Sequence, residues 1–150
     1  MPDGATDREL ERRVRESFAR QRVMETIGAR LARVEPGGIE IELPFDERLT
    51  QQHGFLHAGV VTTVLDSACG YAALSLMEPG FEVLAIEFKV NFLAPAVGER
   101  FVARASVVRS GRTITVSRAD GWMVTGAQEV QVATMTGTMM KVEEWGAARK

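Results

Sequence analysis

The chain has 150 residues, of which 45% are hydrophobic and 25% charged, with a formal net charge of −2 and a single cysteine. These values predict one globular domain over residues 1–150, large enough to bury a core without disulfides or a structural metal. They exclude the basic surface of a protein that binds nucleic acid or an anionic membrane, an internal disulfide, and a cysteine-cluster metal site.

Neither a leader sequence nor a metal site is expected. The first residues lack the charged and apolar regions of a secretory signal, so we expect a cytoplasmic location. No apolar run approaches the ~20 residues that span a bilayer. His53 and His57 lack the accompanying Glu and the third ligand of a zinc hydrolase. We therefore expect no metal and no cofactor.

The first third of the chain predicts a helix followed by a hairpin. The N-terminal segment, residues 1–24, predicts an amphipathic helix on the domain edge. The helical pattern covers residues 7–24 and places Leu10, Val14, Phe18 and Met24 near one face. Residues 27–35 and 38–45 predict two strands that pair across the turn Pro36-Gly37-Gly38. Residues 46–58 are polar and predict a loop.

A long buried helix and a series of strands follow. Residues 59–77 are apolar on nearly every side, which is typical of a helix enclosed by the rest of its domain. The remaining segments alternate with a period near two and have short turns between them, which predicts an antiparallel meander: 83–93, 100–108, 113–123 and 129–142. Residues 143–150 predict a flexible tail. This order predicts an α+β fold, a curved antiparallel sheet wrapped around one central helix.

Asp66 interrupts the apolar helix. Burial of an unpaired carboxylate is far too costly for helix propensity to offset, so Asp66 must be partnered, open to water or protonated. One interpretation is local, with the hydroxyl of Thr62 as the partner. The other, which we favour, places the carboxylate on a pocket wall, where apolar surroundings tune its protonation.

The start of the same helix is a second candidate. The run Gly54-Phe55-Leu56-His57-Ala58-Gly59 leads into a helix N-terminus, whose free N–H groups suit the negative charge that develops on a thioester oxygen during cleavage. A simple tight turn explains the run equally well. Ala58 and Asp66 are eight residues apart, or about 12 Å along a helix. If both act on one substrate, they come from two copies of the helix across a two-fold interface.

Several stretches resemble a known family. They are Gln51–Gly59 followed by Asp66-Ser67-Ala68, the stretch Val90–Glu99, and the hairpin Ser110-Gly111-Arg112. They resemble the hotdog-fold thioesterases, and most closely the PaaI-like (phenylacetate-degradation) branch. The resemblance implies hydrolysis of a small-chain, medium-chain or aryl acyl-CoA by a homodimer or homotetramer. Coenzyme A is then part of the substrate.

The resemblance also implies roles for single residues. Asp66 would be the nucleophile or the general base for water. The backbone N–H of Ala58, with Gly59 beside it, would polarise the thioester carbonyl. Gln51 would place the attacking water or the acyl group, and His57 would brace the loop or bond near the thioester.

Other residues would bind the substrate. Arg112 and Arg109 would lie near the phosphates of coenzyme A, although a solvated hairpin charge explains Arg112 as well. The acyl pocket would be lined by the partner subunit and by small helix residues, namely Cys69, Gly70 and Ala73.

Two positions depart from the family pattern. Ala58 stands where the family usually has Gly, so the substrate approaches the backbone more tightly. Ala85, within the substrate site, stands where several relatives carry a catalytic hydroxyl, which leaves Asp66 to work with Gln51 and water. Two alternatives stay open: a hydratase or dehydratase of the same fold, with His57 or His53 facing Asp66 across the interface, and a non-catalytic acyl-CoA-binding module.

Overall fold

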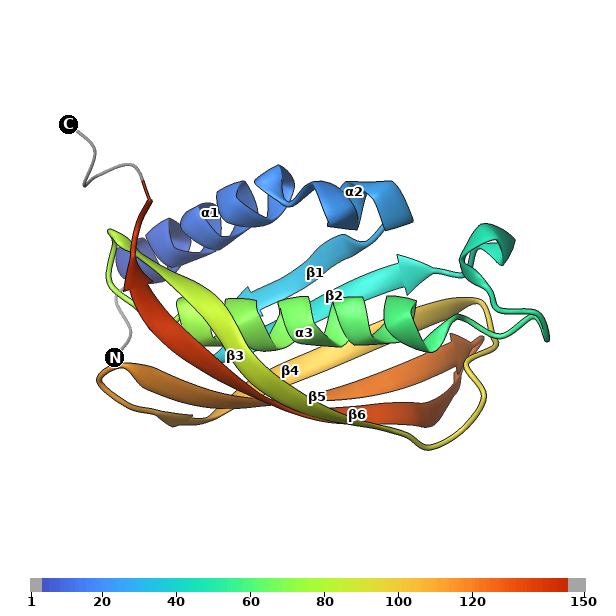
Figure 1. The fold of residues 1–150 in the computed structure, drawn as a ribbon. Helices are drawn as coiled ribbons and strands as arrows, with labels where there is room; N and C mark the ends of the chain where they lie inside the picture. The colour runs from blue at the N-terminus through green and yellow to red at the C-terminus, as the bar shows by residue number, and fades with distance from the viewer. Residues whose placement is uncertain (1–3, 146–150) are drawn as a thin grey trace.

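The computed structural model describes residues 4–145, in which a curved sheet is folded around one long helix (Figure 1). The helical segments are α1 (Gly4–Arg20), α2 (Arg22–Ile27), the 3-10 turn η1 (Glu47–Leu49) and α3 (Ala58–Leu74). The strands are β1 (Arg30–Glu35), β2 (Gly38–Pro44), β3 (Phe81–Phe92), β4 (Arg100–Ser110), β5 (Ile114–Thr125) and β6 (Gln128–Glu143).

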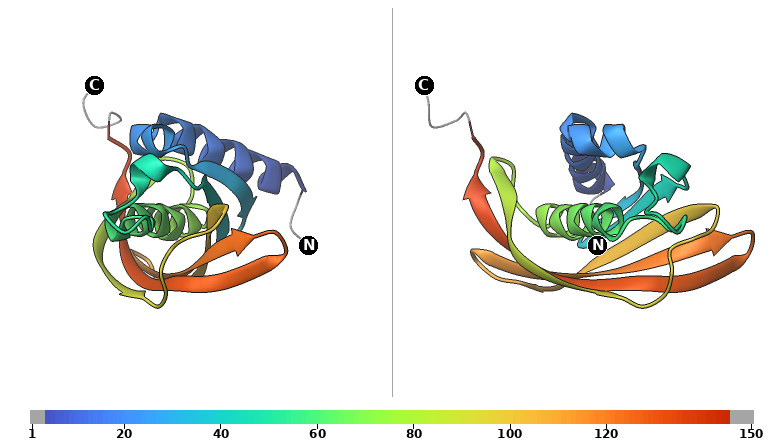
Figure 2. Two further views of the ribbon diagram at one scale, coloured as in Figure 1. Left: turned by 90° about the vertical axis from the view of Figure 1, so that its right-hand side faces the viewer. Right: turned by 45° about the vertical axis from the view of Figure 1, so that its right-hand side comes forward.

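The strands form one six-stranded sheet in the order β1-β2-β4-β5-β6-β3, and every neighbouring pair is antiparallel. Figure 2 shows α3 lying in the hollow of this sheet, with α1 and α2 on the side of α3 that faces away from it. The predicted α+β fold, with a curved antiparallel sheet around a central helix and an extra helical segment before it, is confirmed.

The predicted four-strand meander is wrong in one respect. Strands β4, β5 and β6 follow one another across the sheet, but β3 pairs with β6 at the far edge and β4 pairs with β2. The connection after β3 crosses the ends of the other strands. In that connection the N–H of Leu93 donates to the carbonyl oxygen of Val132 (2.8 Å), and the N–H of Glu99 donates to that of Val124 (2.9 Å). Strand β3 is therefore an edge strand.

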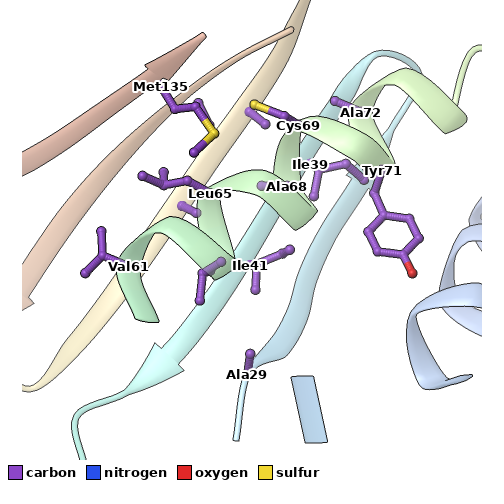
Figure 3. Close-up of a cluster of buried hydrophobic side chains, with 14 of the residues drawn as sticks. Ala29, Ile39, Ile41, Val61, Leu65, Ala68, Cys69, Tyr71, Ala72 and Met135 are labelled. Carbon is purple, nitrogen blue, oxygen red and sulfur yellow. The ribbon is translucent and has the colours of Figure 1, made fainter. Parts of the chain in front are cut away.

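The core lies between α3 and the concave face of the sheet. Val64, Leu65 and Ala68 of α3 are fully buried. Figure 3 shows Leu65 and Ala68 among side chains from several strands, including Ile41 of β2 and Met135 of β6. Burial of one large aliphatic side chain contributes roughly 1.5–3 kcal/mol. These contacts fix the position of α3 in the sheet.

The N-terminal segment forms two helices where one was predicted. Helices α1 and α2 meet at Gln21, whose backbone is extended (φ −79°, ψ 93°), so the chain changes direction there (Figure 1). Val14 on α1 and Met24 on α2 are both buried in the core. The predicted apolar face therefore exists, but two helices rather than one present it.

Helix α1 is tied to the end of α3. The guanidinium group of Arg13 donates hydrogen bonds to the carbonyl oxygens of Leu74 (3.2 Å) and Met77. Leu74 is the last residue of α3, so its carbonyl is one that the helix C-terminus leaves without an intrahelical partner, and Met77 lies just after the helix. Ser17 Oγ and Tyr71 Oη lie 3.3 Å apart. α1 is thus held against α3 by polar contacts as well as by apolar packing.

Both ends of the chain differ slightly from the predicted boundaries. Strand β6 continues to Glu143, and the N–H of Glu144 donates to the carbonyl oxygen of Gly80 (3.0 Å). The predicted flexible tail therefore does not begin at residue 143. The rest of it, residues 146–150, lies outside the described residues, as do residues 1–3.

Candidate active site

Asp66 lies in the middle of α3 with part of its carboxylate removed from water. Its Oδ1 atom is buried and makes no hydrogen bond to the described residues, so Thr62 does not satisfy it. Burial raises the pKa of Asp66 above the ordinary value for an aspartate. A carboxylate in this position is more basic than one on the surface, because its charged form has lost solvation without gaining a partner.

The carboxylate faces a pocket of about 160 Å³ on the side of α3 that faces α1. We call this the Asp66 pocket. Its walls come from both N-terminal and C-terminal parts of the chain: Ser17 and Gln21 before α3; Asp66, Ser67, Gly70, Tyr71 and Leu74 on α3; Glu82, Val83 and Ala85 on β3; and Met139 on β6. Gly70 and Ala85, which the sequence analysis assigned to the substrate site, both line the Asp66 pocket.

Cys69 and Ala73 are not among the residues that line the Asp66 pocket, so their assignment to the acyl pocket stays a prediction. Both are fully buried in the core. A Cβ atom added at Gly137 of β6 would lie 3.5 Å from that of Cys69, so this face of α3 packs closely on the sheet. Figure 3 shows Cys69 near Met135, whereas Tyr71 extends toward the N-terminal helices. Burial raises the pKa of the Cys69 thiol to about 12, so the thiol stays protonated at neutral pH.

The N-terminus of α3 presents one free amide. His57 is the residue before the helix, and its Nδ1 atom accepts a hydrogen bond from the N–H of Gly59 (2.8 Å). The Gly59 amide is therefore engaged, which leaves the predicted polarising role to Ala58. The N–H of Ala58, in the first position of α3, has no acceptor within the helix. His57 thus caps the start of α3, which agrees with the predicted role of bracing this loop.

Ala58 and Gln51 line a different pocket, of about 180 Å³, which we call the amide pocket. Its other walls are mostly apolar and come from the loop before α3, from α3 itself, from the end of β3 and the segment after it, and from β6: Phe55, Leu56, Val61, Phe92, Ala94, Pro95, Ala96 and Val132. The side-chain Oε1 of Gln51 accepts a hydrogen bond from the N–H of His53. No residue lines both the amide pocket and the Asp66 pocket. Within one subunit the two predicted catalytic groups are therefore apart.

Arg112 lies at the hairpin between β4 and β5, in a pocket of about 350 Å³ that also contains Lys141 and Glu143. Lys141 Nζ is 2.6 Å from Glu78 Oε2, so its charge is partly compensated. Arg109 is exposed near the end of β4 and does not line this pocket. Of the two arginines predicted to meet the phosphates of coenzyme A, only Arg112 lies in a hollow with a second cation.

The sequence-based assignment missed most of the residues that line the Asp66 pocket, among them the polar side chains of Ser17, Gln21, Tyr71 and Glu82. The first two lie on a segment that was predicted to pack on the domain edge. The sequence does contain one signal for Ser17 and Gln21. Ser17 and Gln21 are four residues apart beside the apolar positions Val14 and Phe18, which places a polar pair at the border of a buried helix face.

Residues 4–145 contain no group of three or more His, Cys, Asp or Glu side chains that could hold a metal ion. The described helices include none that is long and apolar enough to cross a membrane.

Comparison with known proteins identifies the protein family that the chain resembles. A family model described as the thioesterase superfamily matches residues 53–130. A thioesterase family protein of known crystal structure from Silicibacter pomeroyi is 57% identical, covers 90% of this chain and 99% of its own, and superposes with a TM-score of 0.88. A 1,4-dihydroxy-2-naphthoyl-CoA hydrolase from Listeria monocytogenes is 30% identical over 63% of this chain and 76% of its own length.

A more distant structure shares the fold alone. The PaaI protein of the Escherichia coli phenylacetic acid degradation operon is 17% identical, with a TM-score of 0.82 over 91% of this chain and 96% of its own. The chain spans about two thirds of the length of two other curated relatives, 66% and 68%. These matches confirm the resemblance to hotdog-fold thioesterases and, at the level of the family, the predicted class of thioester hydrolase.

Proposed function

Because the chain belongs to the thioesterase superfamily, we propose that it hydrolyses the thioester of an acyl-CoA, with Asp66 as the catalytic carboxylate. The observation that carries the proposal is the buried, unpartnered Oδ1 of Asp66 on the wall of a pocket. An orphaned charge of this kind is costly to the fold. Its retention is explained if the carboxylate acts on a substrate.

The reaction needs a group that attacks the carbonyl carbon and a donor for the carbonyl oxygen. As a general base, Asp66 takes a proton from water, and the hydroxide oxygen bonds to the carbonyl carbon. As a nucleophile, the carboxylate forms that bond itself, and water then hydrolyses the anhydride. In either case the C–S bond breaks, coenzyme A leaves as the thiolate and takes up a proton, and the acid is released. The N–H of Ala58 stabilises the charge on the carbonyl oxygen meanwhile, and Gln51 positions the water or the acyl group.

We further propose that each active site combines two subunits. Val83 and Ala85, near the start of β3, line the Asp66 pocket, and Phe92, at its end, lines the amide pocket. Two copies of β3 that pair antiparallel about a two-fold axis place the start of one strand beside the end of the other. A pairing centred near Phe88 therefore brings the Asp66 pocket of one subunit to the amide pocket of its partner.

The surface of β3 supports this pairing. The strand is an edge in the sheet, and four of its large apolar side chains are well exposed: Leu84 by 39%, Ile86 by 52%, Phe88 by 43% and Phe92 by 50%. A long apolar edge strand left open promotes aggregation, and coverage by a second copy removes that exposure. A homodimer through β3, or a homotetramer built from two such dimers, satisfies the geometry.

Arg112 and Lys141 supply cations for the phosphates of coenzyme A in this proposal. The cytoplasmic location expected from the sequence stays a prediction.

A thiol-release assay tests the function directly. The purified protein is given a panel of short-chain, medium-chain and aryl acyl-CoA esters, and free coenzyme A is measured, while crotonyl-CoA hydration is followed in parallel. We expect thiol release from at least one ester and no hydration. Hydration without thiol release would identify the same-fold hydratase. Tight binding of the esters with neither reaction would identify a binding module. Either result would overturn the proposal.

A further inference from the structure

Helix α1 closes one side of the Asp66 pocket. Ser17, from the last turn of α1, and Gln21, from the break between α1 and α2, both line it. Gln21 Oε1 accepts a hydrogen bond from Ser67 Oγ (3.2 Å), and Ser67 is the neighbour of Asp66 in the chain. The segment is firmly seated, because Val14 and Met24 on either side are buried in the core. It is therefore a fixed wall.

The lining of this pocket is unusually polar for one that would hold an alkyl chain. Ligand pockets are lined mainly by apolar side chains with a few polar groups that fix orientation. Here the pocket also holds the hydroxyl groups of Ser17 and Tyr71, the amide of Gln21 and the carboxylate of Glu82. Burial raises the pKa of Tyr71, and the nearby charge of Glu82 raises it further, so the phenol stays a neutral donor. A methyl-ended chain would desolvate the Glu82 carboxylate without giving it a partner.

The pocket is also small. A buried cavity of about 150 Å³ holds one benzene molecule, and the Asp66 pocket measures about 160 Å³. About six carbon atoms therefore fill it.

We propose that Ser17 and Gln21 are specificity-determining residues, and that the pocket they close takes a short acyl group with a hydroxyl group at its far end. This inference rests on the proposed thioesterase function. Both residues lie outside residues 53–130, the part matched by the family model. In this proposal part of the selectivity comes from the N-terminal helices, whereas Asp66 and Ala58 lie within the matched part. Glu82 accepts the hydrogen bond of the substrate hydroxyl, and Ser17 or Gln21 donates to its oxygen.

The test compares two substrates that differ by one oxygen atom, hexanoyl-CoA and 6-hydroxyhexanoyl-CoA. Three variants are compared: Ser17→Ala, Gln21→Met and the double variant. These substitutions remove polar groups while keeping most of the side-chain volume. Thr26→Ala is the matched control, because Thr26 is an exposed hydroxyl residue on α2 that bonds only to the carbonyl oxygen of Arg22 in its own helix. The quantity measured is the ratio of kcat/KM values for the two esters.

We expect the wild type to prefer the hydroxylated ester by about 5-fold or more, the effect of one or two hydrogen bonds in a partly enclosed site. The double variant should bring the ratio to within about twofold of one, and Thr26→Ala should keep the wild-type ratio. Partial unfolding lowers both rates equally and leaves the ratio unchanged. A wild-type preference for hexanoyl-CoA, or a double variant with the wild-type ratio, would overturn the inference while leaving the thioesterase intact. An absence of hydrolysis of any acyl-CoA would remove the proposed function, and the inference with it.

Discussion

Asp66 could be identified from the sequence because a lone carboxylate in an apolar helix conflicts with its surroundings. The structure shows the conflict unresolved, with Oδ1 buried and without a partner among the described residues. Cys69 and Ala73 could not be assigned in the same way. A helix that is apolar on every side has no sequence signal for which face meets the sheet. Neither residue lines the Asp66 pocket, so their assignment to the acyl pocket stays a prediction, whereas Gly70, one turn after Asp66, does line it.

Replacement of the carboxylate tests its role. We expect Asp66→Asn to lower kcat/KM for acyl-CoA hydrolysis by about 10²- to 10⁴-fold, because positioned acid–base groups contribute that much to rate. The side chain keeps its volume, so folding and coenzyme A binding should persist, as judged by circular dichroism and by inhibition with the free thiol. Nearly full activity in this variant would remove Asp66 from the mechanism.

The same substitution should change how stability depends on pH. The pKa of Asp66 is raised in the folded protein above the ordinary aspartate value of 3.8. The folded state therefore binds the proton more tightly than the unfolded state, and wild-type stability falls as pH rises through the folded-state pKa. The neutral Asn carries no such penalty. In thermal unfolding, Asp66→Asn should exceed the wild type in Tm at pH 7, and the difference should shrink toward pH 3.5.

An equal difference at both pH values would mean that the variant acts through packing. A lower Tm than the wild type at pH 7 would mean that the carboxylate has a stabilising partner, contrary to its isolation in the structure.

At the scale of elements, the extent of each strand was predicted closely, but the neighbour of each strand was not. Alternation with period two reports which residues face the core and is silent on pairing order. The short segment between β3 and β4 suggested a hairpin, whereas it runs across the end of the sheet and leaves β3 at the edge. The break at Gln21 was also missed, because apolar spacing continues through it from Phe18 to Met24.

The edge position of β3 leads to a prediction about assembly. Ile86→Lys should reduce the molecular mass in solution to that of a monomer and abolish most activity, because it places a charged side chain from each subunit in the apolar interface near the two-fold axis. Val108→Lys is the control. Val108 is exposed by 64% on β4 and, like Ile86, lies at a β-bulge. Light scattering after size-exclusion chromatography gives the mass. If Ile86→Lys keeps the wild-type mass and activity, β3 is not the interface.

At the scale of the molecule, the separation between the two proposed catalytic groups was predictable from helix geometry, and the position of β3 supports a proposal for how two subunits combine them. Eight residues of α3 separate Ala58 from Asp66, a rise of about 12 Å. The two residues line pockets that share no wall, and β3 runs from one pocket to the other. No one segment of the sequence predicts an oligomer. The proposed oligomer rests on the edge strand and the two separate pockets together.

Complementation between two inactive variants tests the shared active site most directly. Asp66→Ala lacks the carboxylate, and Ala58→Pro lacks the donor N–H. Proline is tolerated at the first position of a helix, and the extended backbone of His57 (φ −60°, ψ 137°) suits a residue before proline.

The two variants are unfolded, mixed in equal amounts and refolded together, and mixed dimers are verified by mass spectrometry. If one site takes Asp66 from one subunit and Ala58 from the other, each mixed dimer has one intact site. Random pairing then restores about a quarter of wild-type thioesterase activity per subunit. If verified mixed dimers show no activity, both groups serve the site of the same subunit, and the two-subunit active site is contradicted.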